Sequence, residues 1–209
     1  MGFFTRLLDI LFPPKDSEVL VRETTLAQLG RLISVEEHRP GHISLLPFRA
    51  PSVRALITQA KFFNNPKAQK LLATVLRDYL DARSEEGQGF SARKTILVPV
   101  PLSTERKRER GYNQIERVLA QALSGQDAPV AFVPHLLERT RDTKPQTSLN
   151  RAARKRNMEG AFRATEALES GFIYIVVDDV TTTGATLEAA VSALRGAGAV
   201  HVEALALAH

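Results

Sequence analysis

Two adjacent carboxylates, Asp178 and Asp179, stand at the end of an apolar run in the segment VVDDVTTTGAT, residues 176–186. Four threonines and one glycine fall within the next seven residues, and a helical pattern follows them. A buried strand that ends in polar residues before a helix is typical of the edge where open parallel sheets bind ligands. Free backbone amides and the positive end of the helix dipole at that edge favour a phosphate.

The acids and the threonines predict contacts with two different parts of one ligand. Hydroxyls and amides suit a phosphate, and a glycine lets the backbone approach it closely. Carboxylates repel a phosphate, so the aspartates should meet sugar hydroxyls or a hydrated Mg²⁺ ion. The pattern therefore predicts a site for a ribose 5-phosphate. Its phosphate-binding residues would be Thr181, Thr182, Thr183, Gly184, Ala185 and Thr186.

Two other interpretations of this segment stay open. An apolar strand that ends in acids also occurs in the Walker B motif, which needs a G-x-x-x-x-G-K-[ST] partner elsewhere in the chain. The nearest candidate for that partner, Lys94-Thr95, lacks the glycine before the lysine. The third interpretation is a loop with a purely structural role.

The elements that must position this site alternate between strands and helices from residue 95 onward. The apolar runs predict strands at 95–101, 130–137, 171–177 and 200–208. Helical spacing predicts helices over about 3–11, two between 52 and 80, 112–124, and 185–195 with Gly196 as its C-cap. This alternation predicts an α/β fold with a parallel sheet flanked by helices and right-handed crossovers.

Composition and length narrow the class of protein. A chain of 209 residues with 44% hydrophobic residues can bury a full core, which excludes global disorder. No apolar run approaches the ~20 residues that a membrane-spanning helix needs. The chain has no cysteine, which excludes disulfides and thiolate metal sites. The start of the chain lacks the pattern of an export signal, so we expect a cytoplasmic location.

Positive charge is concentrated in one segment, residues 139–157. Seven basic residues and one acid give this segment a charge of +6, against +5 for the whole chain. One interpretation is a solvated surface loop, a second is a lid that closes over a phosphorylated ligand, and a third is a binding surface for single-stranded DNA. The segment holds no aromatic residue for base stacking, which favours the lid.

The acidic–threonine segment, extended to YIVVDDVTTTGATL, resembles the phosphoribosyl-pyrophosphate (PRPP) motif of type I phosphoribosyltransferases. Three further stretches resemble the ComF family, bacterial phosphoribosyltransferase-like proteins linked to natural competence. They are FRAPSVRALITQAKF at 48–62, LVPVPLSTERKRERGYNQIERVLA at 97–120 and LERTRDTKPQTSLNRAARKRNMEGAF at 137–162. Together the similar stretches cover residues 48–208. The resemblance implies a type I phosphoribosyltransferase-like fold with a helical N-terminal region.

The resemblance also implies roles for particular residues. Asp178 and Asp179 would contact the ribose hydroxyls, with Mg²⁺ as the cofactor. The pyrophosphate loop would consist of Pro99, Val100, Pro101, Leu102 and Ser103. Contacts to pyrophosphate and closure of the lid would fall to Arg110, Arg139, Arg141, Lys144, Gln146 and Arg154. Tyr112, Asn113 and Gln114 are also expected to serve the site, and no residue stands out as a catalytic general base.

One feature departs from the family pattern. ComF proteins usually carry a cysteine-rich zinc ribbon after the LFPP segment, whereas residues 15–47 here contain no cysteine. His38 and His42 flank Pro40-Gly41 and cannot share a helix face, so we expect no structural zinc site. We therefore divide the chain into a helical or irregular region, 1–47, that replaces the ribbon, and a phosphoribosyltransferase-like domain, 48–209.

The leading hypothesis is an Mg²⁺-dependent protein of the ComF type that binds PRPP or another ribose 5-phosphate and either transfers or senses phosphoribosyl groups. It would have a link to DNA uptake and could form a homodimer. The alternative is a non-catalytic accessory of competence that binds single-stranded DNA or a helicase. The acceptor of a transfer reaction is not identifiable from the sequence.

Overall fold

The computed structural model describes residues 14–85, 93–125, 130–141 and 157–209. Its helices are α2 (Pro14–Glu23), α3 (Leu26–Gly30), α4 (Pro51–Phe62), α5 (Pro66–Glu85), α6 (Thr104–Arg110), α7 (Gln114–Ala122) and α9 (Ala185–Gly196). Its strands are β1 (Glu36–Arg39), β2 (His42–Leu46), β3 (Thr95–Pro99), β4 (Val130–Phe132), β5 (Leu137–Arg139), β6 (Phe162–Ala164), β7 (Ile173–Val180) and β8 (His201–Ala208). The predicted helix at 3–11 lies outside the described residues.

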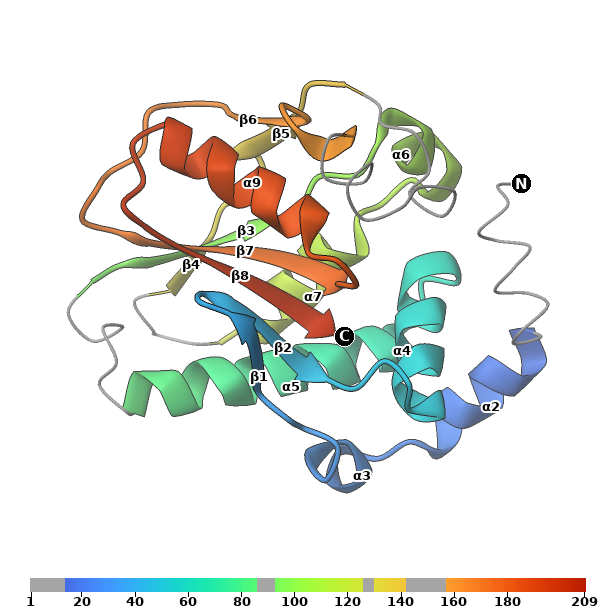
Figure 1. Cartoon of the computed structure of the whole chain (residues 1–209). Helices are drawn as coiled ribbons and strands as arrows, with labels where there is room; N and C mark the ends of the chain where they lie inside the picture. The colour runs from blue at the N-terminus through green and yellow to red at the C-terminus, as the bar shows by residue number, and fades with distance from the viewer. Residues whose placement is uncertain (1–13, 86–92, 126–129, 142–156) are drawn as a thin grey trace.

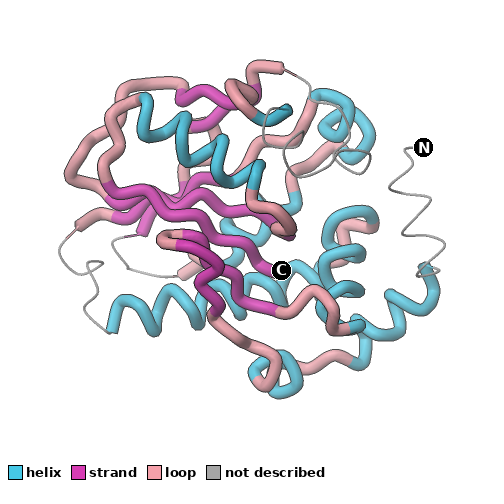
Figure 2. The backbone as a smooth tube through the Cα atoms, in the orientation of Figure 1, coloured by secondary structure: helices cyan, strands magenta, loops and turns pink. Residues whose placement is uncertain are grey.

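A six-stranded, mostly parallel sheet forms the centre of the molecule (Figures 1 and 2). The strand order is β1-β2-β8-β7-β3-β4, and all neighbours are parallel except β1 and β2. The crossover from β7 to β8 runs through α9, and the crossover from β3 to β4 runs through α6 and α7. This arrangement confirms the predicted α/β fold with a parallel sheet flanked by helices.

Side chains alternate between two cores on the two faces of the sheet. In β7, Ile173, Ile175 and Val177 belong to the core beneath α4, α5 and α7. Tyr174 and Val176 belong to the opposite core, which α9 covers. Because a strand directs successive side chains to opposite faces, a continuous apolar run is required when both faces are covered by helices. Figure 1 shows α9 on one side of the sheet and α2, α3, α4, α5 and α7 on the opposite side.

The N-terminal region contains strands that the sequence did not predict. β1 and β2 form an antiparallel hairpin around Gly41, whose φ of +72° suits a glycine at a tight turn. β2 also pairs in parallel with β8, with His42 opposite Ala204 and Leu46 opposite Ala208. The expectation of a helical or irregular region at 1–47 therefore did not include the strands at 36–46. β1 is an edge strand that buries few side chains. Its sequence is therefore short and charged and lacks the apolar pattern that predicts a strand.

Other element boundaries also differ from the predictions. The apolar run at 130–137 is divided between β4 and β5, because Pro134 lies between them and cannot donate to a ladder. α9 ends at Gly196, but the glycine with left-handed backbone is Gly198, with φ of +109°. β7 runs on through both aspartates to Val180, three residues beyond the predicted end.

Within the described part of the chain, no helix combines the length and apolar character that crossing a bilayer requires. The division at residue 47 stays a prediction, although β2 and β8 belong to one sheet.

If the hairpin belongs to the same cooperative unit as the sheet, Leu45→Ala should destabilise the whole protein. Leu45 is 0% exposed and belongs to the core that α4 and α5 cover. Truncation of a buried leucine costs about 2–5 kcal/mol. Urea denaturation followed by far-UV circular dichroism should show a single transition at lower urea. Val35→Ala, at an exposed position in the same region, should change the free energy of unfolding by less than about 0.5 kcal/mol. Separate transitions for the two regions would contradict this expectation.

Candidate functional site

The two aspartates directly precede the last residue of the central strand β7, and strand alternation directs them toward opposite faces of the sheet. Asp179 continues the alternation of Ile175 and Val177 toward the layer of α4 and α7, and its carboxylate contacts both helices. Asp178 continues the alternation of Tyr174 and Val176. Neighbouring positions in one strand therefore place two identical side chains in different surroundings.

Asp179 is buried and held by two side chains from the helical layer. Lys61 Nζ, at the end of α4, lies 2.6 Å from Asp179 Oδ2, and both side chains are nearly inaccessible to solvent. Gln114 Nε2, at the start of α7, donates to the same oxygen at 2.8 Å. Burial opposes ionisation, but the Lys61 ammonium outweighs it and lowers the pKa of the Asp179 carboxyl. Asp179 is therefore a fixed negative charge in the site.

The pKa of the Asp178 carboxyl is shifted in the opposite direction, upward. Burial, followed by the negative charge of Asp179, raises the pKa of the Asp178 carboxyl to about 7. Its Oδ1 accepts a hydrogen bond from the Asp179 backbone amide at 2.8 Å. A carboxyl of this kind ionises fully at neutral pH only when a cation or hydroxyl donors approach it. Strongly shifted acids next to a fixed charge are frequent at functional sites.

The threonine-rich loop joins the end of β7 to the start of α9. Thr181 N donates to Ala208 O at 3.0 Å, which ties the loop to the end of β8. Gly184 is the N-cap of α9 with φ of +73°, and it offers no side chain to cap the helix. The Arg39 guanidinium fills the space beside it, since a Cβ on Gly184 would lie 2.0 Å from Arg39 Nη2. The loop thus presents the amides of a helix N-terminus next to a cation.

The turn predicted as a pyrophosphate loop lies directly beside the end of β7. Val100 N donates to Val177 O at 2.9 Å, one residue before the acid pair. Asn113 Nδ2 donates to Val100 O at 3.1 Å and fixes the turn from the other side. Ser103 caps α6 by accepting a hydrogen bond from Arg106 N at 3.3 Å. The structure therefore brings residues 99–103 and the acid pair to one edge of the sheet.

The segment after α6 holds the buried acid in place. The Tyr112 hydroxyl lies 3.0 Å from Ala60 O and 3.1 Å from Lys61 O, which fixes the end of α4 that carries the lysine. Arg110 Nη1 donates to Gln114 Oε1 at 3.3 Å, and its guanidinium lies 4.8 Å from the centre of the Phe62 ring. Arg110 Nε is buried without a hydrogen-bond partner among the described residues.

The described members of the predicted lid lie at the end of the β5–β6 pair from which the connecting segment leaves. Arg139 stacks over Phe162 at 5.3 Å, and its Nε donates to Arg141 O at 3.3 Å. Arg141 Nη2 donates to the carbonyl oxygens of Asn157 and Glu159 at 3.2 and 2.7 Å. Both guanidiniums thus contact nearby backbone. Lys144, Gln146 and Arg154 lie outside the described residues.

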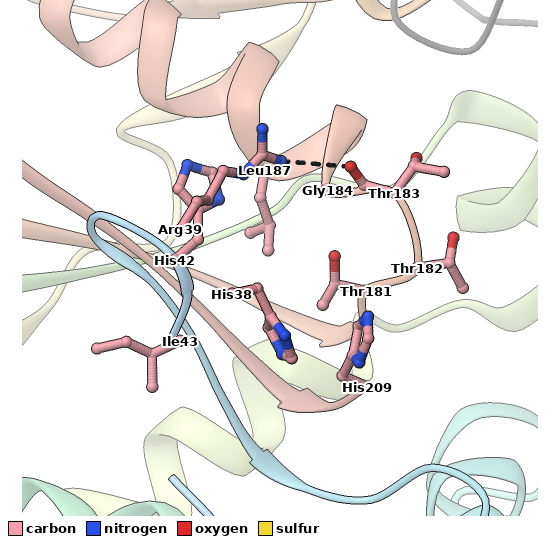
Figure 3. A pocket seen from close by; sticks show the side chains of 10 residues that line it. All are labelled: His38, Arg39, His42, Ile43, Thr181, Thr182, Thr183, Gly184, Leu187 and His209. Carbon is pink, nitrogen blue, oxygen red and sulfur yellow. Dashed lines mark hydrogen bonds between the residues drawn. The ribbon is translucent and has the colours of Figure 1, made fainter. Parts of the chain in front are cut away.

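A pocket of about 290 Å³ opens on the β8 side of the threonine-rich loop (Figure 3). Residues 181–184 form one wall, and the β1–β2 hairpin forms another. Arg39 Nη2 donates to Thr183 O at 3.3 Å across the opening. The pocket is lined by His38, Arg39, His42, Ile43, Thr181, Thr182, Thr183, Gly184, Leu187 and His209. The two aspartates do not line it.

Sequence reasoning missed several residues of this site. Lys61 follows Ile57 by one helical turn, so its place on the same face of the helix was predictable. Its contact with Asp179 depends on how α4 packs against the sheet. Arg39, His38 and His42 reach the loop only because β2 pairs with β8. His209 reaches it as the residue after β8, where its backbone bonds with Leu46 and Phe48.

The fold is of the phosphoribosyltransferase-like α/β class: a mostly parallel sheet flanked by helices, with an acid pair at the end of its central strand and a glycine-capped helix beyond it. No family model matches the chain. It is 38% identical over 156 residues to DNA utilization protein YhgH of Escherichia coli (strain K12), covering 73% of this chain and 66% of the relative.

Two further relatives share the similarity. Identity is 32% over 174 residues with DNA utilization protein YhgH of Salmonella typhi, covering 83% of this chain and 69% of the relative. Identity is 31% over 156 residues with Competence protein F of Haemophilus influenzae, covering 73% of this chain and 66% of the relative. The matches span about two thirds of the length of these curated relatives. The chain belongs to the ComF family.

The raised pKa of Asp178 predicts that Asp178→Asn stabilises the protein at alkaline pH. The folded form holds this proton more tightly than the unfolded chain, so the stability that Asp178 contributes falls as pH rises from about 4 through 7. In urea denaturation at pH 8 without divalent ions, the free energy of unfolding of the asparagine variant should exceed that of the wild type by about 1–3 kcal/mol. At pH 5.5 the difference should be smaller. Equal or lower stability of the variant at pH 8 would contradict the assignment.

Proposed function

We propose that this protein binds PRPP with Mg²⁺ and acts as a phosphoribosyltransferase or a phosphoribosyl sensor. The observation that supports this most is the arrangement of three features at one sheet edge. The acid pair lies in the middle, the loop 181–184 on one side, and the turn 99–103 on the other. A ribose with phosphate at one end and diphosphate at the other has groups that suit these features in the same order.

The residues present suit a divalent ion next to a sugar diol. Asp178 and Asp179 provide the carboxylate oxygens that Mg²⁺ prefers. The pKa of about 7 for the Asp178 carboxyl supports this assignment, because a nearby cation would favour its ionised form. When bound, Mg²⁺ would neutralise charge on the diphosphate as it leaves the anomeric carbon.

The chain's own groups would act by binding and positioning. The amides at the start of α9 and the Arg39 guanidinium would contact the 5-phosphate. Lys61 and Gln114 would keep the Asp179 carboxylate in one orientation toward the ribose. Arg110, which is partly buried beside Gln114, would place positive charge near the diphosphate. The acceptor of a transfer reaction is not part of this proposal.

Calorimetric titration of PRPP with Mg²⁺ into the full chain tests the proposal. We expect saturable binding to the wild type. The double variant Asp178→Asn with Asp179→Asn should bind at least about a hundredfold more weakly, because each lost charged contact is worth about 1.5–3 kcal/mol. The exposed Thr182→Val variant should bind about three- to tenfold more weakly through the lost hydroxyl.

Two controls make this titration decisive. Asp78→Asn, at an exposed position on α5, removes an acid away from the site and should bind as the wild type does. Circular dichroism establishes that each variant is folded, which matters because Asp179→Asn leaves Lys61 without its anion. Absence of heat from folded wild type would overturn the PRPP proposal.

A second candidate function is binding of single-stranded DNA or a helicase as an accessory of competence. The names of the relatives refer to DNA utilization and competence. α6 supports a polyanion surface, because it buries no residue and exposes three consecutive cations, Arg106, Lys107 and Arg108. The link to DNA uptake is compatible with either candidate function.

For the DNA function, binding of a labelled single-stranded oligonucleotide should weaken steeply with salt. Removing three cations with Arg106→Gln, Lys107→Gln and Arg108→Gln should reduce the slope of log K against log salt by about 2, since each phosphate contact contributes about 0.7. The measurement is fluorescence anisotropy at several salt concentrations.

The matched control removes three exposed cations elsewhere, Arg31→Gln, Arg49→Gln and Lys70→Gln, with the same change in net charge. An equal loss in both triple variants would mean that α6 is not the binding surface. No binding at low salt would remove direct DNA binding from the candidate functions.

A further inference from the structure

Two histidines and a glutamate gather at the mouth of the pocket, outside the proposed PRPP contacts. One ligand atom each from Glu36, His38 and His209 lies within 4.8 Å of the others. The two imidazole rings lie side by side with centroids 3.9 Å apart, below Thr181 in Figure 3. All three residues are exposed, so small side-chain rotations can bring the three atoms to the separation of about 3.3–3.5 Å found around a zinc ion.

Backbone geometry brings these residues together from distant parts of the chain. The pairing register of β1 with β2 shifts between Glu37 and Arg39, so His38 lies at an irregularity of the ladder. Such bulges redirect a side chain and are frequent next to functional sites. The irregularity also explains why the consecutive residues His38 and Arg39 both line the pocket. A regular strand would direct one of them to the opposite face.

His209 and the ring of His38 are each held by a hydrogen bond. His209 N donates to Leu46 O at 3.0 Å, and Phe48 N donates to His209 O at 2.7 Å. The buried Ser44 hydroxyl lies 2.7 Å from His38 Nε2. A second partner that orients the ring is the usual arrangement for a metal-binding histidine. Ser34 Oγ also donates to Glu36 Oε1, at 3.2 Å.

From this geometry we propose that Glu36, His38 and His209 bind a divalent transition metal of the zinc class. Two imidazoles and one carboxylate are a donor set that zinc accepts, and three protein ligands leave one position of a four-coordinate ion for water or a ligand oxygen. The metal would adjoin the pocket, because His38 and His209 line it. It would also connect β1 to the residue after β8. The expectation of no zinc site rested on the missing cysteines and on the pair His38 and His42. It did not consider this set of three ligands, which contains no cysteine.

The test is titration of Zn²⁺ alone into the full chain, free of any histidine tag, in competition with a chromophoric chelator. We expect one Zn²⁺ per chain. His38→Gln and His209→Gln should each weaken binding by at least about tenfold, and Ser44→Ala by about tenfold through loss of ring orientation. Co²⁺ in place of Zn²⁺ should give intense visible bands of a four-coordinate site in the wild type and lose them in His38→Gln.

His135→Gln is the matched control, because His135 is exposed and lies elsewhere on the molecule. It should bind Zn²⁺ as the wild type does. The proposal is overturned if the wild type binds no stoichiometric Zn²⁺, or if Co²⁺ gives only the weak spectrum of a six-coordinate aqua ion. It is also overturned if His135→Gln weakens binding as much as His38→Gln, which would indicate unspecific binding by surface histidines. These outcomes are independent of PRPP binding.

Discussion

The pairing of β7 with a neighbouring strand on each side determines where the acid pair, the turn 99–103 and the loop 181–184 lie. β7 pairs with β3 along one edge, up to Val177, and with β8 along the other, up to Val180. The amide of Val100 bonds to Val177, and the amide of Thr181 bonds to the end of β8. The turn after β3 and the loop after β7 therefore cannot move independently of the strand that carries the acids. Two flexible connections acquire fixed positions because each is tied to the ladder of the sheet.

The same strand explains why its two acids differ. Alternation directs Asp179 into the helical layer, where Lys61 and Gln114 stabilise its negative charge. The Lys61 charge also lowers the pKa of Asp178, but burial together with the Asp179 charge outweighs it and disfavours ionisation. A buried ion pair contributes little net stability, since desolvation offsets much of the attraction. The Lys61–Asp179 pair is therefore better understood as a device that fixes one charge and leaves the other responsive to a ligand.

Much of the sheet and the sequence-local part of the site were predictable, while the parts assembled across the sheet were not. The strand at 173–180, helix α9 and the loop between them follow from an apolar run, a glycine and a helical period within one segment. Lys61 and Arg39 lie 118 and 140 residues from Asp179 in the chain, in segments whose patterns carry no sign of that neighbour. The β1–β2 hairpin was missed because its edge strand reads EEHR, which is polar on both faces. Long-range pairing, not local propensity, makes it a strand.

The hairpin also completes the charge distribution around the acids. Arg39 lies on the β8 side of the acid pair, against the loop 181–184, and Arg110 lies on the β3 side, after the turn 99–103. Negative charge at the centre of the site is thus flanked by a guanidinium on each side. A ligand with a single phosphate would engage only one of these ends. The arrangement favours a ligand that is anionic at both ends and carries hydroxyls between them, which is the charge order of the PRPP molecule proposed as its ligand.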